Sequence, residues 1–310
     1  MTSVKWTTLW PGLGDEGEWS HSGVGVLRDG RVVFAPPGRN GLVLLDAESG
    51  AWTTRSAPVY LSHGIEVATR GGNEGVWLAD PGDSEAHGEV VWLDLGSGAS
   101  ERLPRPSERW RPTATATVRR GNHAGDVWVA DGYGESIVYR FDDDRRWIGF
   151  DGSHSGQQFS CPHGVAIDTR GEDDVVVVAD RSNRRLVFLD LDGEFIRAVA
   201  DDAMTSPSSI AVRGDELIVT DLFGAILAVG MDDQVRRILG DGRRDRSEGW
   251  PNAVRESVDV RPPLVDGVLN SPHGVVIGAR GEIYLTEWVL GGRQVRLEAD
   301  RNSRDRGRIR

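Results

Sequence analysis

The chain has 310 residues with 36 basic and 48 acidic side chains, and its formal net charge of −12 disfavours nucleic acid and anionic membrane surfaces as partners. A hydrophobic content of 38% excludes disorder of the whole chain, and 40 glycines with 14 prolines disfavour a helical bundle. No signal-peptide pattern or run of about eighteen apolar residues occurs, and the single cysteine, Cys161, cannot form an internal disulfide. These features predict a cytoplasmic location. We also expect a monomer whose partner is a small molecule or a peptide.

A repeated pattern divides the chain into six units of roughly 50 residues. Each unit runs through a glycine-containing turn into a β-rich segment, and in most units that segment ends in an acidic residue. In chain order these segments are VVFAPPG, GVWLAD, VWVAD, VVVVAD, LIVTD and IYLTE. Short runs of Val, Ile, Trp and Leu between Gly, Asp and Asn are typical of strands and hairpins. Residues 175–200, for example, predict three strands separated by turns at residues 182–183 and 192–193.

Four-stranded units repeated around an axis form a β-propeller, so the predicted fold class is an all-β, six-bladed β-propeller. The last unit is one strand short, because it contains only GVVIGA, EIYLTEW and RQVRLEA. The segment VKWTTLW near the N-terminus has no unit of its own. We predict that this N-terminal strand closes the last blade. Residues 1–300 would then form a single propeller domain, and the arginine-rich residues 301–310 a solvated, disordered tail.

Histidine recurs at one position of the repeat. Read in chain order, the residue that leads into the inner strand of each unit is Ser22, His63, Thr113, His163, Ser208 and His273. The three histidines occur in every second unit, which places their imidazoles about 120° apart around the axis. Three histidines around one point are a familiar zinc arrangement that leaves a fourth position open. Alternatively, PHG is only a turn entering the blade, in which Pro fixes φ and Gly adopts a positive φ.

The other four histidines carry no prediction of metal binding. His21 is out of phase with Ser22, the residue that aligns with the three repeated histidines. His87, His123 and His154 lie in turns rich in Gly, Asn and Ser, where we expect solvent-exposed side chains.

Two further residues are expected beside the metal. Tyr133 follows the acidic strand end of the third unit, in VADGYGES, and Arg39 occupies the corresponding loop of the first unit, in FAPPGRN. Together they could supply a phenol base and a fixed cation, since a nearby metal or guanidinium favours the phenolate. The alternative is that Tyr133 only packs on its loop and that Arg39 is solvated.

The order PHG, ADGYGES, GQQFSCPHG, VADRSNRR and SPHG resembles the NHL-repeat propellers, and among them the peptidyl-α-hydroxyglycine α-amidating lyases (peptidylamidoglycolate lyases). The similarity runs from about Val32 to Val295. VADRSNRR is shared by many NHL-repeat proteins, whereas DGY combined with GQ.FS.PH and three spaced histidines is more specific. The resemblance implies Zn²⁺, or another divalent metal, bound by the three repeated histidines, with Tyr133 and Arg39 as catalytic residues. The family has an Asp after its third histidine that helps hold a structural Ca²⁺, but here Gly274 stands at that position, which leaves this Ca²⁺ in doubt.

The resemblance implies a zinc-dependent carbon–nitrogen lyase that cleaves an α-hydroxyglycine-type carbinolamide to an amide and glyoxylate. The residue types fit this chemistry, because a metal can act as a Lewis acid on the hydroxyl and Tyr133 can accept its proton. Two alternatives stay open. One is a metal-dependent hydrolase such as a lactonase, whose calcium site would use carboxylates and Asn rather than imidazoles. The other is a non-catalytic NHL interaction module.

Overall fold

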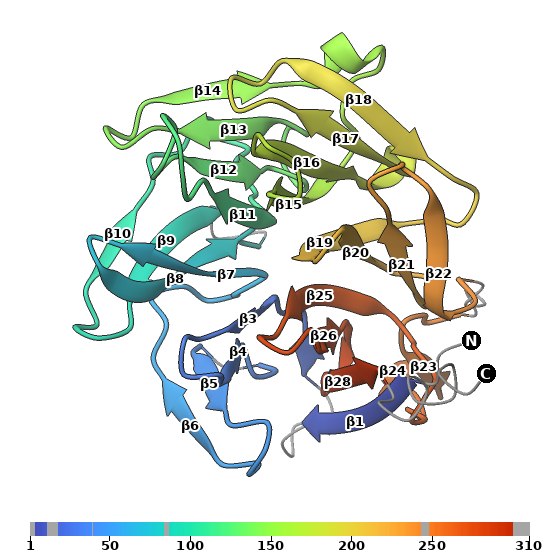
Figure 1. Cartoon of the computed structure of the whole chain (residues 1–310). Coiled ribbons are helices and arrows are strands. Elements are labelled where there is room, and N and C mark those ends of the chain that lie inside the picture. The colour runs from blue at the N-terminus through green and yellow to red at the C-terminus, as the bar shows by residue number, and fades with distance from the viewer. Residues whose placement is uncertain (1–3, 11–17, 39, 84–86, 243–247, 300–310) are drawn as a thin grey trace, which may run out of the picture.

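The computed structural model describes residues 4–10, 18–38, 40–83, 87–242 and 248–299. In these residues, six four-stranded antiparallel sheets surround a central axis as the blades of a β-propeller (Figure 1). The helical segments in the same ranges are two 3₁₀ turns, η1 (Ser153–Ser155) and η2 (Arg181–Asn183). The predicted all-β, six-bladed class is confirmed. No helix in the described part of the chain is long and apolar enough to cross a membrane.

The first five blades follow the chain from the inner strand to the outer strand, and the sixth contains both ends of the described chain. The strands of blades 1 to 3 are β3 (Val24–Val26), β4 (Val32–Phe34), β5 (Leu42–Leu45), β6 (Trp52–Arg55), β7 (Gly64–Arg70), β8 (Asn73–Asp80), β9 (Glu89–Asp94), β10 (Ser100–Arg102), β11 (Ala114–Thr117), β12 (Val127–Ala130), β13 (Val138–Phe141) and β14 (Trp147–Phe150). Those of blades 4 to 6 are β15 (Pro162–Asp168), β16 (Val175–Asp180), β17 (Arg185–Leu189), β18 (Phe195–Ala200), β19 (Pro207–Arg213), β20 (Glu216–Asp221), β21 (Ala225–Val229), β22 (Val235–Gly240), β25 (Pro272–Ile277), β26 (Ile283–Glu287), β28 (Arg293–Ala299) and β1 (Val4–Trp10). Two short pairs are β2 (Trp19–Ser20) with β27 (Val289–Leu290), and β23 (Ala253–Arg255) with β24 (Val258–Val260).

The N-terminal strand closes the last blade, as predicted. β1 is the outer strand of blade 6 and pairs antiparallel with β28, with Trp6 opposite Leu297. The inner strands β3, β7, β11, β15, β19 and β25 contact one another in a closed ring around the axis (Figure 1). The expected tail at 301–310 lies outside the described residues.

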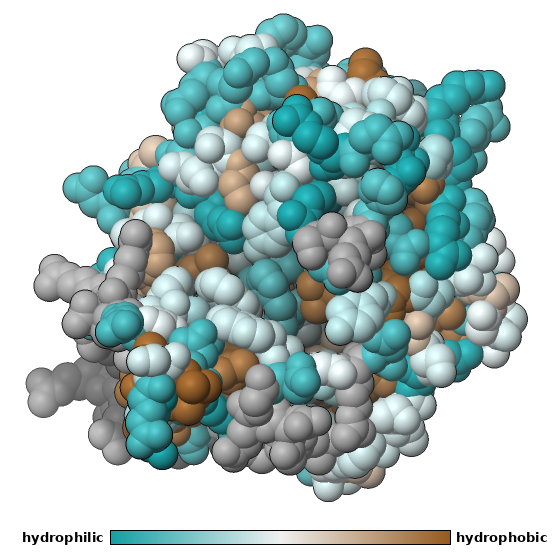
Figure 2. Space-filling view, turned by 180° about the vertical axis from the view of Figure 1, so that it is seen from behind, coloured by the Kyte–Doolittle hydropathy of each residue, from teal (hydrophilic) through white to brown (hydrophobic). Residues whose placement is uncertain are grey.

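The hydrophobic core lies between the blades. In the described residues, each pair of neighbouring blades encloses its own cluster, such as Val33, Leu42 and Leu78 between blades 1 and 2. Phe34 and Tyr284 lie in the cluster between blades 1 and 6, which completes the ring. Because both faces of a blade are covered, its middle strands are continuous apolar runs rather than alternating ones. Figure 2 shows that hydrophobic residues form only small separate groups on one outer face.

A buried carboxylate at the end of the second strand holds the loop that leads into the inner strand. In blade 5, Asp221 accepts hydrogen bonds from the backbone amides of Thr205 (2.6 Å) and Ser206 (2.7 Å). The same contact recurs in four other blades. There a backbone amide donates to the carboxylate in the pairs Leu61 to Asp80 (2.8 Å), Arg111 to Asp131 (2.6 Å), Ser160 to Asp180 (2.8 Å) and Asn270 to Glu287 (2.6 Å). Each held amide lies two or three residues before the position at which histidine recurs. The acidic strand ends noted in the sequence therefore fix the start of the inner strands.

Replacing one of these carboxylates should destabilise the fold. Asp221→Ala leaves buried backbone amides without an acceptor, so we expect the free energy of unfolding to fall by at least about 2 kcal/mol. Chemical denaturation followed by circular dichroism measures this change. The matched control is Asp144→Ala, which removes an exposed carboxylate that pairs with the exposed Arg146 and should change stability by less than about 0.5 kcal/mol. Equal stabilities of the two variants would contradict this role of Asp221.

Candidate metal centre

His63, His163 and His273 lie at one end of the inner strands β7, β15 and β25. All three side chains are buried, with exposed fractions of 1%, 2% and 3%. The centres of their rings are 4.6 to 5.0 Å apart, and each pair of rings meets edge to face. The structure therefore brings the three repeated histidines together on the propeller axis.

Each of these imidazoles is held by the backbone of the next blade. Nδ1 of His63 lies 2.8 Å from the carbonyl oxygen of Thr113, and Nδ1 of His163 lies 3.0 Å from that of Ser208. Nδ1 of His273 lies 3.2 Å from the carbonyl oxygen of Ser22. A carbonyl can only accept, so Nδ1 carries the proton in each ring and Nε2 is left with a lone pair. The partners are the residues that occupy the histidine position in the intervening blades.

The glycine after each histidine permits this close approach. A Cβ on Gly64 would lie 2.7 Å from the Thr113 carbonyl oxygen, and one on Gly164 would lie 2.5 Å from that of Ser208. Gly64 and Gly164 do not belong to the glycines with positive φ, so the explanation of PHG as a positive-φ turn is wrong. Glycine is required here because the neighbouring strand leaves no room for a side chain.

His21 joins the three buried histidines, so its exclusion from the site on sequence grounds is wrong. One ligand nitrogen from each of His21, His63, His163 and His273 lies within 4.8 Å of all the others. The alternation rule failed because residues 21–23 lie between β2 and β3 and are not in a strand, so side chains there need not alternate. His87 and His154 are exposed, as expected, whereas His123 is half-buried and lies 3.0 Å from Asp126.

The Tyr133 hydroxyl faces three of these four histidines. Its Oη lies 3.0 Å from Nε2 of His163, 3.3 Å from that of His63 and 3.4 Å from that of His21. The side chain follows β12 on the loop whose amides are held by Asp131, including that of Glu135 at 2.8 Å. Tyr133 is therefore beside the candidate metal position, as its sequence context predicted.

Arg181 is a site residue that the sequence analysis missed. It follows β16 at the start of η2, and its guanidinium lies over the Tyr133 ring at 5.3 Å, with Nη1 3.5 Å from Oη. Nη2 donates to Sγ of Cys161 at 3.0 Å. Within the described ranges no carboxylate forms an ion pair with Arg181. The available signal was its place directly after the acidic strand end of blade 4, close to the position of Tyr133 in blade 3. Arg39, the cation that we predicted, lies outside the described residues.

Burial keeps the imidazoles neutral. It lowers the pKa of His63 to about 3, with a smaller contribution from the positive charge of Arg181. Burial likewise lowers the pKa values of His21, His163 and His273 well below the ordinary value. The pKa of Tyr133 is raised because its burial outweighs the opposing attraction of Arg181. The guanidinium therefore lowers the pKa of Tyr133, as expected, but burial has the larger effect on it.

The donor set fits a transition metal. Nε2 of His63 and Nε2 of His273 face each other at 3.2 Å, although neither ring has a proton there to share. Two nitrogens bound to one tetrahedral Zn²⁺ at 2.0–2.1 Å would be about 3.3 Å apart. Tyr133 has a single hydroxyl proton and can satisfy only one of the lone pairs directed at it. Four imidazoles without a carboxylate suit Zn²⁺ and its neighbours better than Ca²⁺.

The position of the family's calcium-binding Asp has no room for a side chain. A Cβ on Gly274 would lie 2.9 Å from Oγ1 of Thr286 and 3.1 Å from Cα of Gly23. The residues at this position therefore do not fit the structural Ca²⁺ that the resemblance left in doubt.

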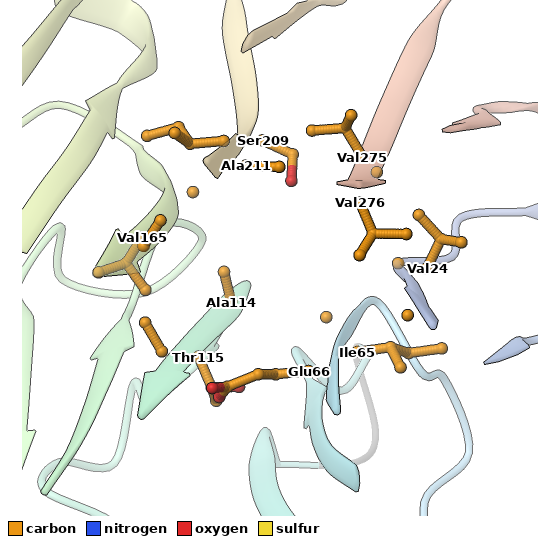
Figure 3. A pocket seen from close by; sticks show the side chains of 18 of the residues that line it. Val24, Ile65, Glu66, Ala114, Thr115, Val165, Ser209, Ala211, Val275 and Val276 are labelled. Carbon is orange, nitrogen blue, oxygen red and sulfur yellow. The ribbon is translucent and has the colours of Figure 1, made fainter. Parts of the chain in front are cut away.

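A cavity of about 450 Å³ runs along the inner strands, and the three repeated histidines belong to its lining. Tyr133, Arg181 and His21 do not line it. Figure 3 shows its labelled valine, isoleucine and alanine side chains around one space, with the half-buried acid Glu66 among them. Glu66 accepts hydrogen bonds from the amide (2.7 Å) and hydroxyl (3.1 Å) of Thr117. Tyr133 and His21 thus contact the repeated histidines from outside this cavity.

Comparison with known proteins shows the fold. No family model matches the sequence, and no curated protein matches it. Among solved structures, this chain is similar to a streptogramin B lyase, with a TM-score of 0.62, 14% identity and coverage of 96% of this chain and 98% of that chain. It is also similar to virginiamycin B lyase from Staphylococcus aureus with quinupristin (TM-score 0.57, 12% identity, 95% and 99% covered). A luciferin-regenerating enzyme matches with a TM-score of 0.60 and 12% identity over 95% of both chains.

A methyl group at the glycine after His163 should disturb the contact between blades. Gly164→Ala would place its Cβ against the Ser208 carbonyl, so we expect a loss of about 1–3 kcal/mol in the free energy of unfolding. Thermal and chemical denaturation test this loss. Gly171→Ala serves as the control, since φ there is not positive and a Cβ would make only an ordinary contact, 3.4 Å from Asp173. If both variants were as stable as the wild type, the close approach of the inner strands would not require glycine.

Proposed function

We propose that this protein is a metal-dependent lyase that cleaves the carbon–nitrogen bond of an α-hydroxyglycine-type carbinolamide, giving an amide and glyoxylate. The observation that carries the proposal is the convergence of the Tyr133 hydroxyl with the Nε2 lone pairs of His63 and His163. In the proposed reaction, this hydroxyl would move a proton and the neighbouring imidazoles would bind the metal. The same combination was expected from the resemblance to the amidating lyases.

His63, His163 and His273 would hold the metal, with Zn²⁺ as the first choice. Each is neutral and directs a lone pair into the common space, as metal binding requires. A bound divalent cation supplies Lewis-acid chemistry at the hydroxyl oxygen of the substrate. The backbone carbonyls that accept from Nδ1 fix the direction of the ligands and increase their basicity.

Tyr133 would move the proton of the reaction. In the substrate R–CO–NH–CH(OH)–COO⁻, the hydroxyl proton would pass to Oη of the Tyr133 phenolate and the C–O bond would become a double bond. The C–N bond then breaks, the nitrogen takes the electron pair, and Tyr133 returns the proton to that nitrogen. The products are the amide and glyoxylate, with no net oxidation. General acid–base catalysis of this kind contributes typically about 10²–10⁴-fold.

Arg181 would assist in two ways. Its guanidinium favours the phenolate form of Tyr133, and a bound divalent cation would act in the same direction. It also offers donors to the carboxylate of the substrate, because Nη1 faces the site and the described residues supply it with no carboxylate partner. Arg39 was expected in this role from the sequence and is a second candidate for it.

The similar structures and the histidine ligands argue against the two alternatives, a non-catalytic interaction module and a calcium-dependent lactonase. Two of the structures with a similar propeller are named as lyases, which supports catalysis over a purely interacting module. Function depends on the site rather than on the fold, so the imidazoles carry more weight. A calcium-dependent lactonase would need oxygen ligands, and no carboxylate belongs to the histidine cluster in the described part of the chain.

The metal part of the proposal is tested by elemental analysis. Protein purified without added metal should contain close to one equivalent of a divalent metal, and His163→Ala should lose most of it because one of the ligands is gone. His154→Ala, which changes an exposed histidine, should keep the wild-type content. Full metal occupancy in His163→Ala would rule out this ligand set.

The catalytic part is tested by glyoxylate release from α-hydroxyhippurate and ureidoglycolate. At equal metal occupancy, Tyr133→Phe should keep the fold but lower turnover by about 10²-fold or more, because only the hydroxyl is removed. Tyr60→Phe is a suitable control, since that side chain is 68% exposed and lies outside the site. Equal rates for Tyr133→Phe and the wild type would remove Tyr133 from the mechanism. No glyoxylate from any carbinolamide would remove the lyase function itself.

A further inference from the structure

His21 presents a fourth imidazole to the space shared by the three repeated histidines. Its ring centre lies 4.3 Å from that of His63 and 4.5 Å from that of His273. Its Nε2 is 3.4 Å from the Tyr133 hydroxyl, the group that also faces His63 and His163. The ring therefore points its nitrogen inward although its residue belongs to none of the inner strands.

A stack of aromatic rings holds His21 in this orientation. Trp288 stacks on the imidazole at 5.2 Å with an angle of 26° between the planes. Trp19 stacks in turn on Trp288 at 5.4 Å and 29°. The side chain of His21 thus lies between the tryptophans and the other histidines, so packing limits the ways in which its ring can turn.

The backbone on both sides of this stack is fixed to blade 6. β2 pairs with β27, with Trp19 opposite Leu290. The amide of Gly291 donates to the carbonyl of Glu18 at 2.8 Å, and the amide of Trp288 donates to the carbonyl of Ser271 at 3.0 Å. Ser271 precedes the inner strand that bears His273. The segment that carries His21 is therefore attached to the same blade as one of the repeated histidines.

We propose that His21 is a resident fourth ligand of the metal, so that this protein binds its metal through four imidazoles. The proposal rests on the metal site of the proposed function and goes beyond its three repeated histidines. Four imidazoles would supply the four ligands that Zn²⁺ usually has in proteins, and the substrate hydroxyl would then be a fifth, which zinc sites permit. Tyr133 and Arg181 then mark the side from which the substrate enters. Trp288 is a positioning residue in this arrangement.

The first experiment counts the ligands. X-ray absorption at the metal edge of the protein as purified should fit four imidazole nitrogens in the wild type and three in His21→Ala. His87→Ala, which changes an exposed histidine, should keep four. Three imidazoles in both the wild type and His21→Ala would overturn the proposal and leave His21 as a hydrogen-bonding neighbour of Tyr133.

The second experiment measures affinity by competition of Zn²⁺ with a chelator. Loss of groups that only orient ligands typically weakens metal binding about 10–100-fold, so loss of a ligand in His21→Ala should weaken it by at least about tenfold. His21→Gln, which nearly keeps the volume of the ring, should behave in the same way if both variants retain the wild-type circular dichroism spectrum. Trp288→Ala should weaken binding less than His21→Ala, because its effect is indirect. Unchanged affinity in both His21 variants would contradict the proposal.

The two proposals fail in different ways. A wild type that holds its metal through three imidazoles and releases glyoxylate would keep the lyase function and exclude His21 as a ligand. A wild type with four imidazoles and no activity on carbinolamides would keep the ligand set and exclude the lyase function.

Discussion

The site depends on one repeated interaction, the contact of each buried imidazole with the backbone carbonyl of the next blade. This contact decides which ring nitrogen carries the proton, and so it directs the other nitrogen toward the axis. It requires the neighbouring inner strands to approach closely, which is possible because glycine follows each histidine. It also requires a defined start of each inner strand, which the buried carboxylates at the strand ends provide. Ring closure, loop conformation and ligand direction are therefore parts of one arrangement.

The electrostatic character of the site follows from its burial. Burial lowers the pKa values of the four imidazoles and so keeps them neutral. A neutral imidazole has the free lone pair that a metal ligand needs. Arg181 is a fixed positive charge nearby, and its guanidinium lies over the phenol of Tyr133. Neutral donors on the axis and a cation at the side are the features that the proposed metal and the proposed anionic substrate require. This combination says more about function than the propeller fold does, because solved structures only 11–14% identical to this chain have the same fold.

The sequence predicted most of the fold because a propeller repeats its local signals. Six β-rich segments with similar turns predicted six blades, and an orphan strand at one end predicted the closure by β1. The convergence of His63, His163 and His273 was also predictable, since equal offsets in equivalent blades lead to equivalent places around an axis. Tyr133 was found by the same reasoning, because it follows the acidic end of a strand.

His21 and Arg181 could not be assigned in this way. His21 lies on a segment that is not part of a strand, so no periodicity relates its direction to that of Ser22. Its place follows from the pairing of β2 with β27 and from stacking on Trp288, contacts between residues more than 260 positions apart. Arg181 stands in VADRSNRR, the least specific part of the resemblance, and its role in the site becomes apparent only from its contact with Tyr133. The sequence by itself determined the number of blades, their closure and three of the imidazoles, because repetition converts local pattern into global position. Only the tertiary structure decided the fourth imidazole and the cation, because non-repeated loops are placed by long-range packing.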